Sequence, residues 1–564
     1  MDKTFFGIRR HEKSADLKAP FNILVNQLGY LPRLKKRAVI TEPCDSFCVK
    51  DNSGRVVFEG VPTHFGFDKS SGDDVYIADF SPLCADGEYR VYANGKSSPA
   101  FNISACVYKN ALDDALKALY FLRCGCELDK KHAGEYTHPA CHLSKAVVWS
   151  EKDGKNAKQY DVSGGWHDAG DYGRYVTAAA CTVAHLLYGY IMFPDVYKAQ
   201  NINIPESGSG MPDILCECRY ELLWLLKMQR EDGGVWHKVT TAKHAAFVMP
   251  QEDLGQLYLF DVSSSATADF AAVCALAARV YSSDKDFSER LAAAALKADK
   301  WLRENPDFIG FKNPEGCNTG SYGEHNDTDN RFWANAELYA LTGDESYHNA
   351  LKITADSVPL AELGYACVSG LGTLAYLLCC QNTDSALSDK MKNAFYENAL
   401  SYKQTSDSCG YFVALEEYQY CWGCNMNVGK SAMTFIISDY LSGKDEYGDY
   451  AAAQLDYLLG VNATGYSYIT GCGEHSANYP HLRPAHADKI EKCMPGFVVG
   501  GANPHPCEPE ARTRLPKGTP PMKCYIDEMP FYSLNEVAIY WNSPVIFVLG
   551  YLNGIADKGE SREK

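Results

Sequence analysis

A glycine-rich segment carries two carboxylates that could activate a water molecule. The run GGWHDAGDYGRY, residues 164–175, places Asp168 and Asp171 three residues apart just before a predicted helix. The positive end of a helix dipole favours an ionised carboxylate, which is the form that a general base needs. The alternative is that Asp171 caps the following helix. Spacing alone leaves both interpretations open.

A glutamate near the C-terminus could supply the matching acid. Glu536 stands at the head of an almost wholly apolar segment that predicts a helix over residues 535–553. Burial in such surroundings raises the pKa of a carboxyl, as a general acid requires. The alternative is a capping box, because Ser533 and Glu536 form the pattern Ser-x-x-Glu.

Two cysteines and two histidines could form a zinc site. Cys124, Cys141, His142 and His167 would fill a tetrahedral coordination sphere and leave no open position for catalysis. Their spacing matches no standard zinc finger. From the residues alone, unrelated buried cysteines and surface histidines are therefore the default interpretation.

Two further loops carry polar residues. His481 and Arg483 stand two apart in the loop 478–484 and could bind sugar hydroxyls or a carboxylate, with a plain solvent-exposed loop as the alternative. The run SGSG at 207–210 precedes a predicted helix, but no Gly-Lys-Ser/Thr follows it. We therefore reject a nucleotide phosphate site there.

The elements that must position these residues change in character along the chain. Residues 21–104 contain short β-rich runs separated by turn signals, which predict a small β-sandwich. Residues 105–556 show helical periodicity without a repeat of fixed period. They predict about twelve helices, near 107–122, 174–192, 211–230, 262–282, 287–304, 330–342, 345–356, 365–381, 385–400, 427–442, 447–459 and 535–553. We expect one ring of paired helices with a cleft on its loop face, and tails over 1–20 and 557–564.

Composition excludes several classes of partner. The 564 residues include 54 Lys and Arg against 71 Asp and Glu, a net charge of −17. Such an acidic chain is poorly suited to nucleic acid or an anionic membrane surface. No apolar run is long enough to span a membrane, and the first residues lack a secretion signal. The 22 scattered Cys then indicate reduced thiols. We expect a cytoplasmic protein, or a secreted one if a leader was removed.

Taken together, these segments resemble glycoside hydrolase family 9, the inverting cellulase family, in its subgroup with an N-terminal immunoglobulin-like domain. The resemblance runs from residue 22 to 552 in the order of the family. It rests on NILVNQLGYLP at 22–32, HPACH at 138–142, DVSGGWHDAGDYGRYV at 161–176, PESGSGMPDIL at 205–215, SSSATADFAA at 263–272, YCWGCNMNVGKSAMTFI at 420–436 and YSLNEVAIYWNSPVIFVLGYL at 532–552. It implies an immunoglobulin-like β-sandwich followed by an all-α (α/α)6 barrel.

The resemblance also implies roles for single residues. Asp171 would be the general base, Asp168 would help to hold the nucleophilic water, and Glu536 would be the general acid. The predicted sugar contacts are His481, Arg483, Trp422 and Trp541. Leu482 stands where the family has a second histidine, so one cleft contact is lost or replaced, and Cys424 replaces a common serine.

The resemblance further implies metals. Relatives bind a structural zinc at positions that match Cys124, Cys141, His142 and His167, which reverses the default interpretation given above. Cys126 competes with Cys124 for the first position. The acidic loop EHNDTDN at 324–330 resembles a calcium loop, but Asn330 replaces a ligand Glu. Calcium is therefore the weaker expectation, and a solvated acidic loop is the alternative.

The expected activity is hydrolysis by an inverting enzyme. The implied substrates are β-1,4-glucosidic bonds of cello-oligosaccharides or soluble and mixed-linkage β-glucans, cut by a monomer of endoglucanase type. An exo-acting β-glucosidase or exo-β-glucosaminidase is the alternative within the family. A sugar-binding protein without turnover is disfavoured by the presence of both catalytic carboxyls, and a zinc hydrolase by a closed coordination sphere.

Overall fold

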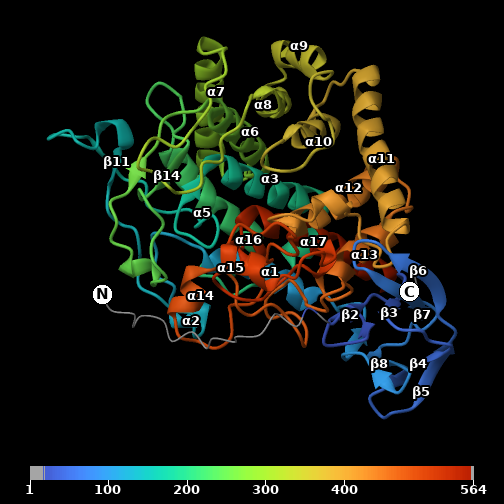
Figure 1. Cartoon of the computed structure of the whole chain (residues 1–564). Coiled ribbons are helices and arrows are strands. Elements are labelled where there is room, and N and C mark those ends of the chain that lie inside the picture. Colours follow the sequence, from blue (N-terminus) through green and yellow to red (C-terminus); the bar gives the residue numbers. More distant parts are fainter. Residues whose placement is uncertain (1–16, 18, 561–564) are drawn as a thin grey trace, which may run out of the picture.

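The computed structural model describes residue 17 and residues 19–560 of the chain (Figure 1). A small β-domain lies at one corner and packs against a large helical body (Figure 1). No helix among the described residues is long and apolar enough to cross a membrane. The cysteines, which all fall within the described residues, form no disulfide.

The β-domain is a sandwich of two sheets, as predicted. Buried side chains from both sheets, such as Ile40, Val49, Val91 and Phe101, meet in a core of their own. In β8 buried and less buried positions alternate, which is the pattern of a strand with one face on a core. One sheet has the order β1 (Ile23–Leu24), β3 (Arg37–Ile40), β7 (Asp73–Asp79) and β6 (Thr63–Asp68). The other has the order β2 (Gly29–Tyr30), β10 (Phe101–Ile103), β8 (Gly87–Ala93), β4 (Phe47–Asp51) and β5 (Val56–Gly60), with β9 (Lys96–Ser97) beside β8.

The helical body contains inner and outer helices. The inner helix α6 is buried all round from Ser264 to Ala278, whereas the outer helix α7 buries only one stripe that includes Phe287, Leu291 and Ala298. Among the described residues the inner helices are α3 (Val176–Met192), α6 (Ser264–Val280), α8 (Thr328–Thr342), α10 (Ser369–Cys379), α12 (Cys424–Ser442) and α17 (Ile539–Glu560). The outer ones are α1 (Lys109–Phe121), α5 (Asp213–Lys227), α7 (Lys285–Glu304), α9 (Glu345–Thr354), α11 (Ser385–Asp407) and α13 (Gly448–Leu458).

These helices pair as an (α/α)6 barrel requires. Each outer helix contacts an inner one, for example α7 on α6, α5 on α3 and α1 on α17. Neighbouring inner helices contact each other from α12 through α17, α3, α6 and α8 to α10. Shorter helical pieces lie in the loops: α2 (Lys130–Ala133), α4 (Pro194–Lys198), α14 (Arg483–Ala487), α15 (Pro509–Arg514) and α16 (Tyr532–Asn535), with 3-10 turns at Trp149–Glu151, Pro250–Glu252, Glu417–Gln419 and Pro521–Lys523.

Two expectations about the last helix need correction. The segment predicted as one helix over 535–553 is broken, because residues 536–538 are extended between α16 and α17. The helix then continues to Glu560, so it occupies the first part of the predicted tail 557–564. Most of the predicted tail over 1–20 lies outside the described residues.

A sheet on the loop face of the barrel was not predicted. Its order is β12 (Gln159–Tyr160), β11 (Ala146–Val148), β15 (Tyr258–Leu259), β14 (Lys238–Thr240) and β13 (Arg174–Tyr175). β13 follows the segment that carries Asp168 and Asp171 and leads directly into α3. Pairing with β14 therefore fixes where that segment leaves the ring of helices.

Candidate active site

Two segments from opposite ends of the helical domain meet through main-chain hydrogen bonds. The Ile539 N–H donates to the Asp168 carbonyl oxygen over 2.8 Å, and Ala169 pairs with Ala538 as an antiparallel bridge. Glu536 forms a parallel bridge with His481. The predicted acid, the predicted base loop and the predicted His481 loop therefore converge at one point.

Arg483 holds this junction together. Its Nη1 donates to the Gly170 carbonyl oxygen over 2.6 Å, and its Nε donates to the Ala245 carbonyl oxygen over 2.9 Å. The side chain is buried. A Cβ at Gly170 would lie 1.8 Å from the His481 carbonyl oxygen, so this close approach requires glycine. Arg483 was predicted to contact sugar, but in the structure two of its nitrogens are engaged by the main chain.

Asp171 is a buried carboxylate with a histidine partner. Its Oδ2 lies 2.9 Å from Nδ1 of His244 and accepts a hydrogen bond of 3.3 Å from the Tyr175 hydroxyl. Burial raises the pKa of Asp171, but the bond to His244 and the charges of His244 and Arg483 outweigh it and lower the pKa to about 2. No side chain caps α3, so the capping alternative for Asp171 is not realised.

Asp168 lies beside it with one oxygen free. Its Oδ2 accepts a hydrogen bond of 2.5 Å from the Tyr322 hydroxyl, and its buried Oδ1 has no partner among the described residues. Burial and the charge of Asp171 raise the pKa of Asp168 well above its usual range, although the Tyr322 bond opposes them. Tyr322 has φ 46°, a conformation that bulky residues rarely adopt.

Glu536 differs from Asp171 in its surroundings. Desolvation, followed by the charges of Asp171 and Asp168, raises the pKa of Glu536 well above its usual range. The charge of Arg483 and a hydrogen bond from the Trp422 side chain offset this only in part. The capping box with Ser533 does not form, because the N–H and hydroxyl of Ser533 donate to Glu508 at 2.8 and 2.6 Å. Glu536 instead sits in the extended break before α17.

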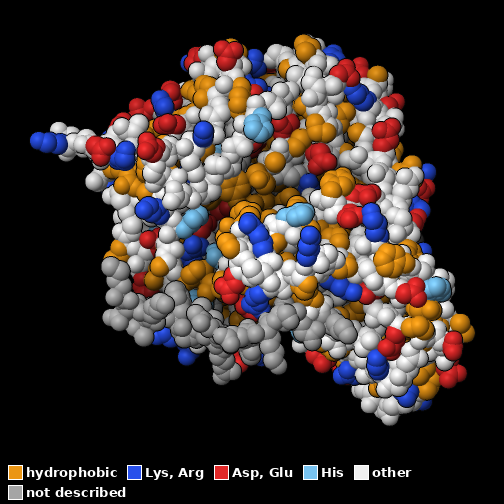
Figure 2. All heavy atoms as spheres, in the orientation of Figure 1, with side chains coloured by type: hydrophobic (Ala, Val, Ile, Leu, Met, Phe, Trp, Pro, Cys, Tyr) orange, Lys and Arg blue, Asp and Glu red, His pale blue; other side chains and the backbone are white. Residues whose placement is uncertain are grey.

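These carboxyls share a cleft of about 340 Å³. Trp422 stands at its edge with 46% of its surface exposed, whereas Trp541 is only 4% exposed and packs under Gly423. Figure 2 shows a hollow lined with hydrophobic side chains near the middle of the face on which α16 lies. The aromatic lining suits the flat faces of pyranose rings. It comprises Tyr175, Tyr322, Tyr365, Trp422, Tyr540 and Trp541.

His481 lies beside Glu536 but is not among the residues that line this cleft. Its Nδ1 lies 2.8 Å from the Met529 carbonyl oxygen, and its ring packs on Phe247 and Tyr532. Burial lowers the pKa of His481 to about 4, so the ring is neutral at neutral pH. Contact of His481 with sugar stays a prediction.

The sequence analysis did not find all of these residues. His244, Tyr322, Tyr365 and Tyr540 line the cleft and were not singled out. Two of them, His244 and Tyr322, lie in long irregular segments between helices. Such long loops are usually functional, and this was the available signal.

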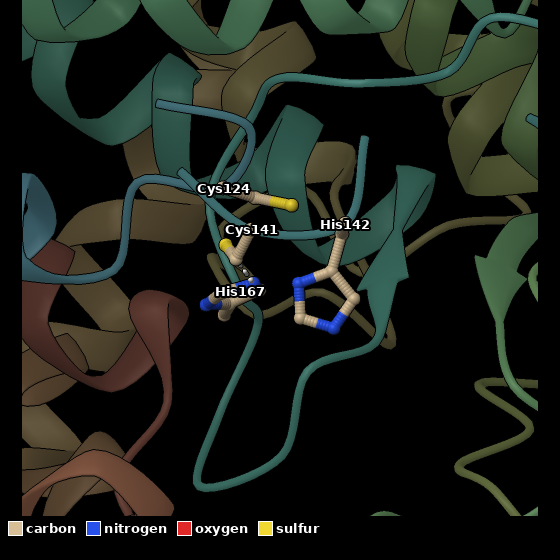
Figure 3. Close-up of side chains that lie close together, drawn as sticks. All are labelled: Cys124, Cys141, His142 and His167. Atoms are coloured by element: carbon tan, nitrogen blue, oxygen red, sulfur yellow. Dashed lines mark hydrogen bonds between the residues drawn. The ribbon is translucent and has the colours of Figure 1, made fainter. Parts of the chain in front are cut away.

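The predicted zinc ligands lie together. One ligand atom from each of Cys124, Cys141, His142 and His167 falls within 4.8 Å of the others, and all four residues are buried (Figure 3). Two sulfurs and two imidazole nitrogens fit a tetrahedral zinc site. Cys126 is not part of the cluster.

The state of the ligands also fits a metal. His142 Nε2 lies 3.3 Å from Oδ2 of Asp253, while its buried Nδ1 has no partner among the described residues and points toward the other ligands (Figure 3). Burial raises the pKa of the Cys124 thiol, but a hydrogen bond with Cys141 and the charges of Arg174 and His167 bring it well below its usual range. Such a cysteine is a thiolate, the form that binds metal.

The acidic loop fits calcium less well. Oδ2 of Asp327 lies 2.8 Å from Nε of Arg331, and Oδ2 of Asp329 accepts a hydrogen bond from the Val368 N–H. Among the described residues, this loop forms no converging set of three acidic ligands. Glu324 is instead close to the buried Asp269, and calcium stays a prediction.

Comparisons with known proteins agree with this geometry. The sequence model described as glycosyl hydrolase family 9 matches residues 108–549, and that of the cellulase N-terminal Ig-like domain matches residues 18–98. A cellodextrinase of Butyrivibrio fibrisolvens is 44% identical over 546 residues, which cover 93% of this chain and 98% of the relative.

Solved structures of similar proteins superimpose on most of the chain. A thermostable endoglucanase mutant of Alicyclobacillus acidocaldarius has a TM-score of 0.88 at 33% identity, over 95% of this chain and 100% of that one. A Zn-binding triple mutant of the family 9 endoglucanase J30 has a TM-score of 0.88 at 33% identity, over 93% and 99%.

Proposed function

We propose that this chain, which belongs to glycosyl hydrolase family 9, hydrolyses β-1,4-glucosidic bonds in short cello-oligosaccharides and soluble or mixed-linkage β-glucans. It is a cellulase-like glycoside hydrolase. The observation that carries the proposal is the pair Asp171 and Glu536 in one aromatic cleft, with the pKa of one lowered to about 2 and that of the other raised well above its usual range.

The proposed reaction proceeds in one step with inversion. Glu536, still protonated, gives its proton to the glycosidic oxygen as the bond from that oxygen to the anomeric carbon breaks. Asp171 takes a proton from a water molecule, whose oxygen bonds to the anomeric carbon from the opposite side. An inverting enzyme holds its two carboxyls roughly 6.5–9.5 Å apart, so that this water fits between them.

Asp168 and Tyr322 support the water in this proposal. The Tyr322 hydroxyl fixes one oxygen of Asp168 and leaves Oδ1 without a partner among the described residues. Because Oδ1 belongs to a side chain that lines the cleft next to Asp171, it can accept a hydrogen bond from the attacking water. Asp168 then orients the water, and Asp171 removes its proton.

Zinc would hold the base segment in shape. Cys124, Cys141, His142 and His167 would bind it in a closed tetrahedral site, which supplies folding stability and no catalytic position. His167 directly precedes Asp168, so the metal would fix the start of the segment that carries both aspartates.

The remaining alternative is an enzyme that cleaves at the chain end instead of within the chain. An exo-acting β-glucosidase or exo-β-glucosaminidase would use the same carboxyls. The name cellodextrinase of the similar Butyrivibrio protein supports short oligosaccharides, and the endoglucanase of Alicyclobacillus supports internal cuts.

A time course on cellotriose to cellohexaose and on chitosan oligomers tests the proposal, with product lengths and anomers resolved. Internal cuts that release α-anomers first are expected. Loss of one terminal unit at a time would favour the exo-acting alternative, initial β-anomers would contradict inversion, and no turnover would contradict the proposal. Cytoplasmic location and the monomeric state stay predictions, which cell fractionation and sedimentation would check.

A further inference from the structure

One surface segment joins the Cys/His cluster to the predicted base. We call residues 244–253 the strap. At its first residue, Nδ1 of His244 lies 2.9 Å from Oδ2 of Asp171. At its last residue, Oδ2 of Asp253 lies 3.3 Å from Nε2 of His142. One end of the strap therefore touches the catalytic carboxylate, and the other touches a metal ligand.

The middle of the strap has a second link to the same cluster. The Tyr172 hydroxyl donates to the Val248 carbonyl oxygen over 2.5 Å. The Tyr172 ring lies against both imidazoles of the cluster, with centroids 5.2 Å from His142 and 4.9 Å from His167. A displacement of these imidazoles would therefore reach the strap through Tyr172 as well as through Asp253.

The strap has little regular structure of its own. Its one defined element is the 3-10 turn Pro250–Glu252, and His244 and Ala246 are exposed. Leu254, directly after it, is 89% exposed. The position of the strap therefore depends largely on contacts outside it: Asp253, the Tyr172 bond, the Arg483 bond to the Ala245 carbonyl oxygen, and the Phe247 ring packed on His481.

Asp253 also selects the form of His142 that can bind a metal. Since Nε2–H donates to Asp253, the remaining proton-free nitrogen is Nδ1, which faces the other ligands (Figure 3). A carboxylate behind a ligating histidine orients the ring and fixes its tautomer, and its removal costs about 10–100-fold in metal affinity or activity.

We propose that Asp253 is a positioning residue that holds His142 for the metal and, through the strap, holds His244 against Asp171. The metal centre and the catalytic base are thereby coupled through ten residues of surface chain. This coupling rests on the proposed function, because it assigns His244 a role beside the catalytic base.

The first test measures metal retention and does not require turnover. The zinc-loaded full-length protein, D253A, D253N and the control E252Q are exposed to a chelator, and zinc release is followed over time. Glu252 is a matched control, since the bond that its carboxylate forms among the described residues lies within the strap, to the Met249 N–H. We expect D253A to release zinc about 10–100 times faster than E252Q, and D253N, whose amide oxygen still accepts a hydrogen bond, to fall between them. Equal release rates for D253A and E252Q would overturn the proposal.

The second test measures coupling to His244. The kcat on cellotetraose is compared for wild type, D253A, H244A and D253A/H244A, all loaded with zinc. If Asp253 holds His244 in place, H244A lowers kcat much less in the D253A background than in the wild type, and KM changes little. If the fold-loss in kcat of the double variant equals the product of the two single losses, the residues act independently and the proposed coupling is overturned.

The two tests fail separately from the proposed function. A wild type without any glycosidase activity would remove the proposed function and the coupling to His244, while the zinc-release comparison would still decide whether Asp253 supports the metal ligand. A variant D253A that fails to fold is replaced by D253N in both tests. D253N indistinguishable from wild type in kcat and zinc release would then count against the proposal.

Discussion

Nδ1 of His244 lies 2.9 Å from Oδ2 of Asp171, whereas Glu536 is hydrogen-bonded by the neutral indole of Trp422. Both carboxyls are desolvated, which by itself raises the pKa of each. The imidazole beside Asp171 reverses that effect on one side of the cleft only. The largest contribution to the difference between base and acid therefore comes from one histidine in an irregular loop.

Replacing that histidine should shift the acid side of the pH profile. In H244Q the hydrogen bond and charge of His244 are lost, which leaves the charges of Arg483 and His167 to oppose the burial of Asp171, so the pKa of Asp171 rises. Since Asp171 must be ionised to act as a base, kcat/KM should begin to fall at a pH about 1–3 units higher than in the wild type. The exposed β-domain variant H64Q is the control. An unchanged acid limb in H244Q would contradict the role of His244.

The two predicted catalytic carboxyls should differ in their response to the leaving group. On cellotetraose, D171N and E536Q should each lose about 10²–10⁴-fold in kcat. On a dinitrophenyl cellobioside the leaving group needs no proton, so E536Q should recover most of its activity and D171N should not. Circular dichroism and zinc content verify the fold. Recovery of D171N instead would exchange the two roles.

Trp422 should tune the acid as well as bind sugar. Its bond to Glu536 lowers the pKa of that carboxyl. W422F keeps an aromatic face but loses the N–H, so the pKa of Glu536 rises and the alkaline limb of kcat/KM should move to higher pH. W422A should in addition raise KM for cellotetraose, because stacking area is lost. A KM for W422A equal to that of W422F would argue against stacking.

The proposed zinc site should distinguish Cys141 from Cys126. C141S removes a member of the buried cluster, and C126S changes a cysteine outside it. We expect C141S to lose bound zinc and to melt several degrees lower, since structural zinc contributes directly to folding. C126S should keep one zinc per chain and melt close to the wild type. Metal analysis and calorimetry check both, and the opposite order would assign Cys126 as the ligand.

The partly buried Glu324, beside the buried Asp269, should make stability fall with rising pH. Burial, with the charges of Asp329 and Asp327, raises the pKa of Glu324 to about 8 in the folded state, above its usual value of 4.5. The unfolded chain releases this proton from about pH 4.5, so the folded state loses relative stability between that pH and about 8. E324Q cannot ionise and should melt higher, relative to the wild type, as pH rises through this window. A melting temperature of the wild type that rises on adding calcium would show that the pair binds the ion instead.

The parts of the fold that could be predicted are those that depend on the spacing of apolar residues within one segment. Inner helices such as α6 are apolar all round and outer ones such as α7 carry a stripe, and both signals are read from neighbouring residues. The sheet that holds β13 was missed because its strands are two or three residues long and pair across 12 to 111 positions of sequence.

Site residues within a sequence motif could be predicted. The roles of residues that depend on contacts with distant parts of the chain could not. Ser533 and Glu536 have the spacing of a capping box, but Glu508 takes both donors of Ser533. Arg483 stands in a loop that suggests sugar binding, yet two of its nitrogens hold main-chain carbonyl groups. His244 and Tyr322 reach the aspartates from loops about 70 and 150 residues away.

The bond from Ile539 to Asp168 has a consequence for synthesis of the chain. The base segment leaves the ribosome about 370 residues before the acid and its junction do. Domains fold as their residues become available, and closure of a loop of about 370 residues costs little more than closure of one half as long. Catalytic competence is then acquired last. A partly made chain can form the β-domain and much of the ring while it is still unable to cut a glucan.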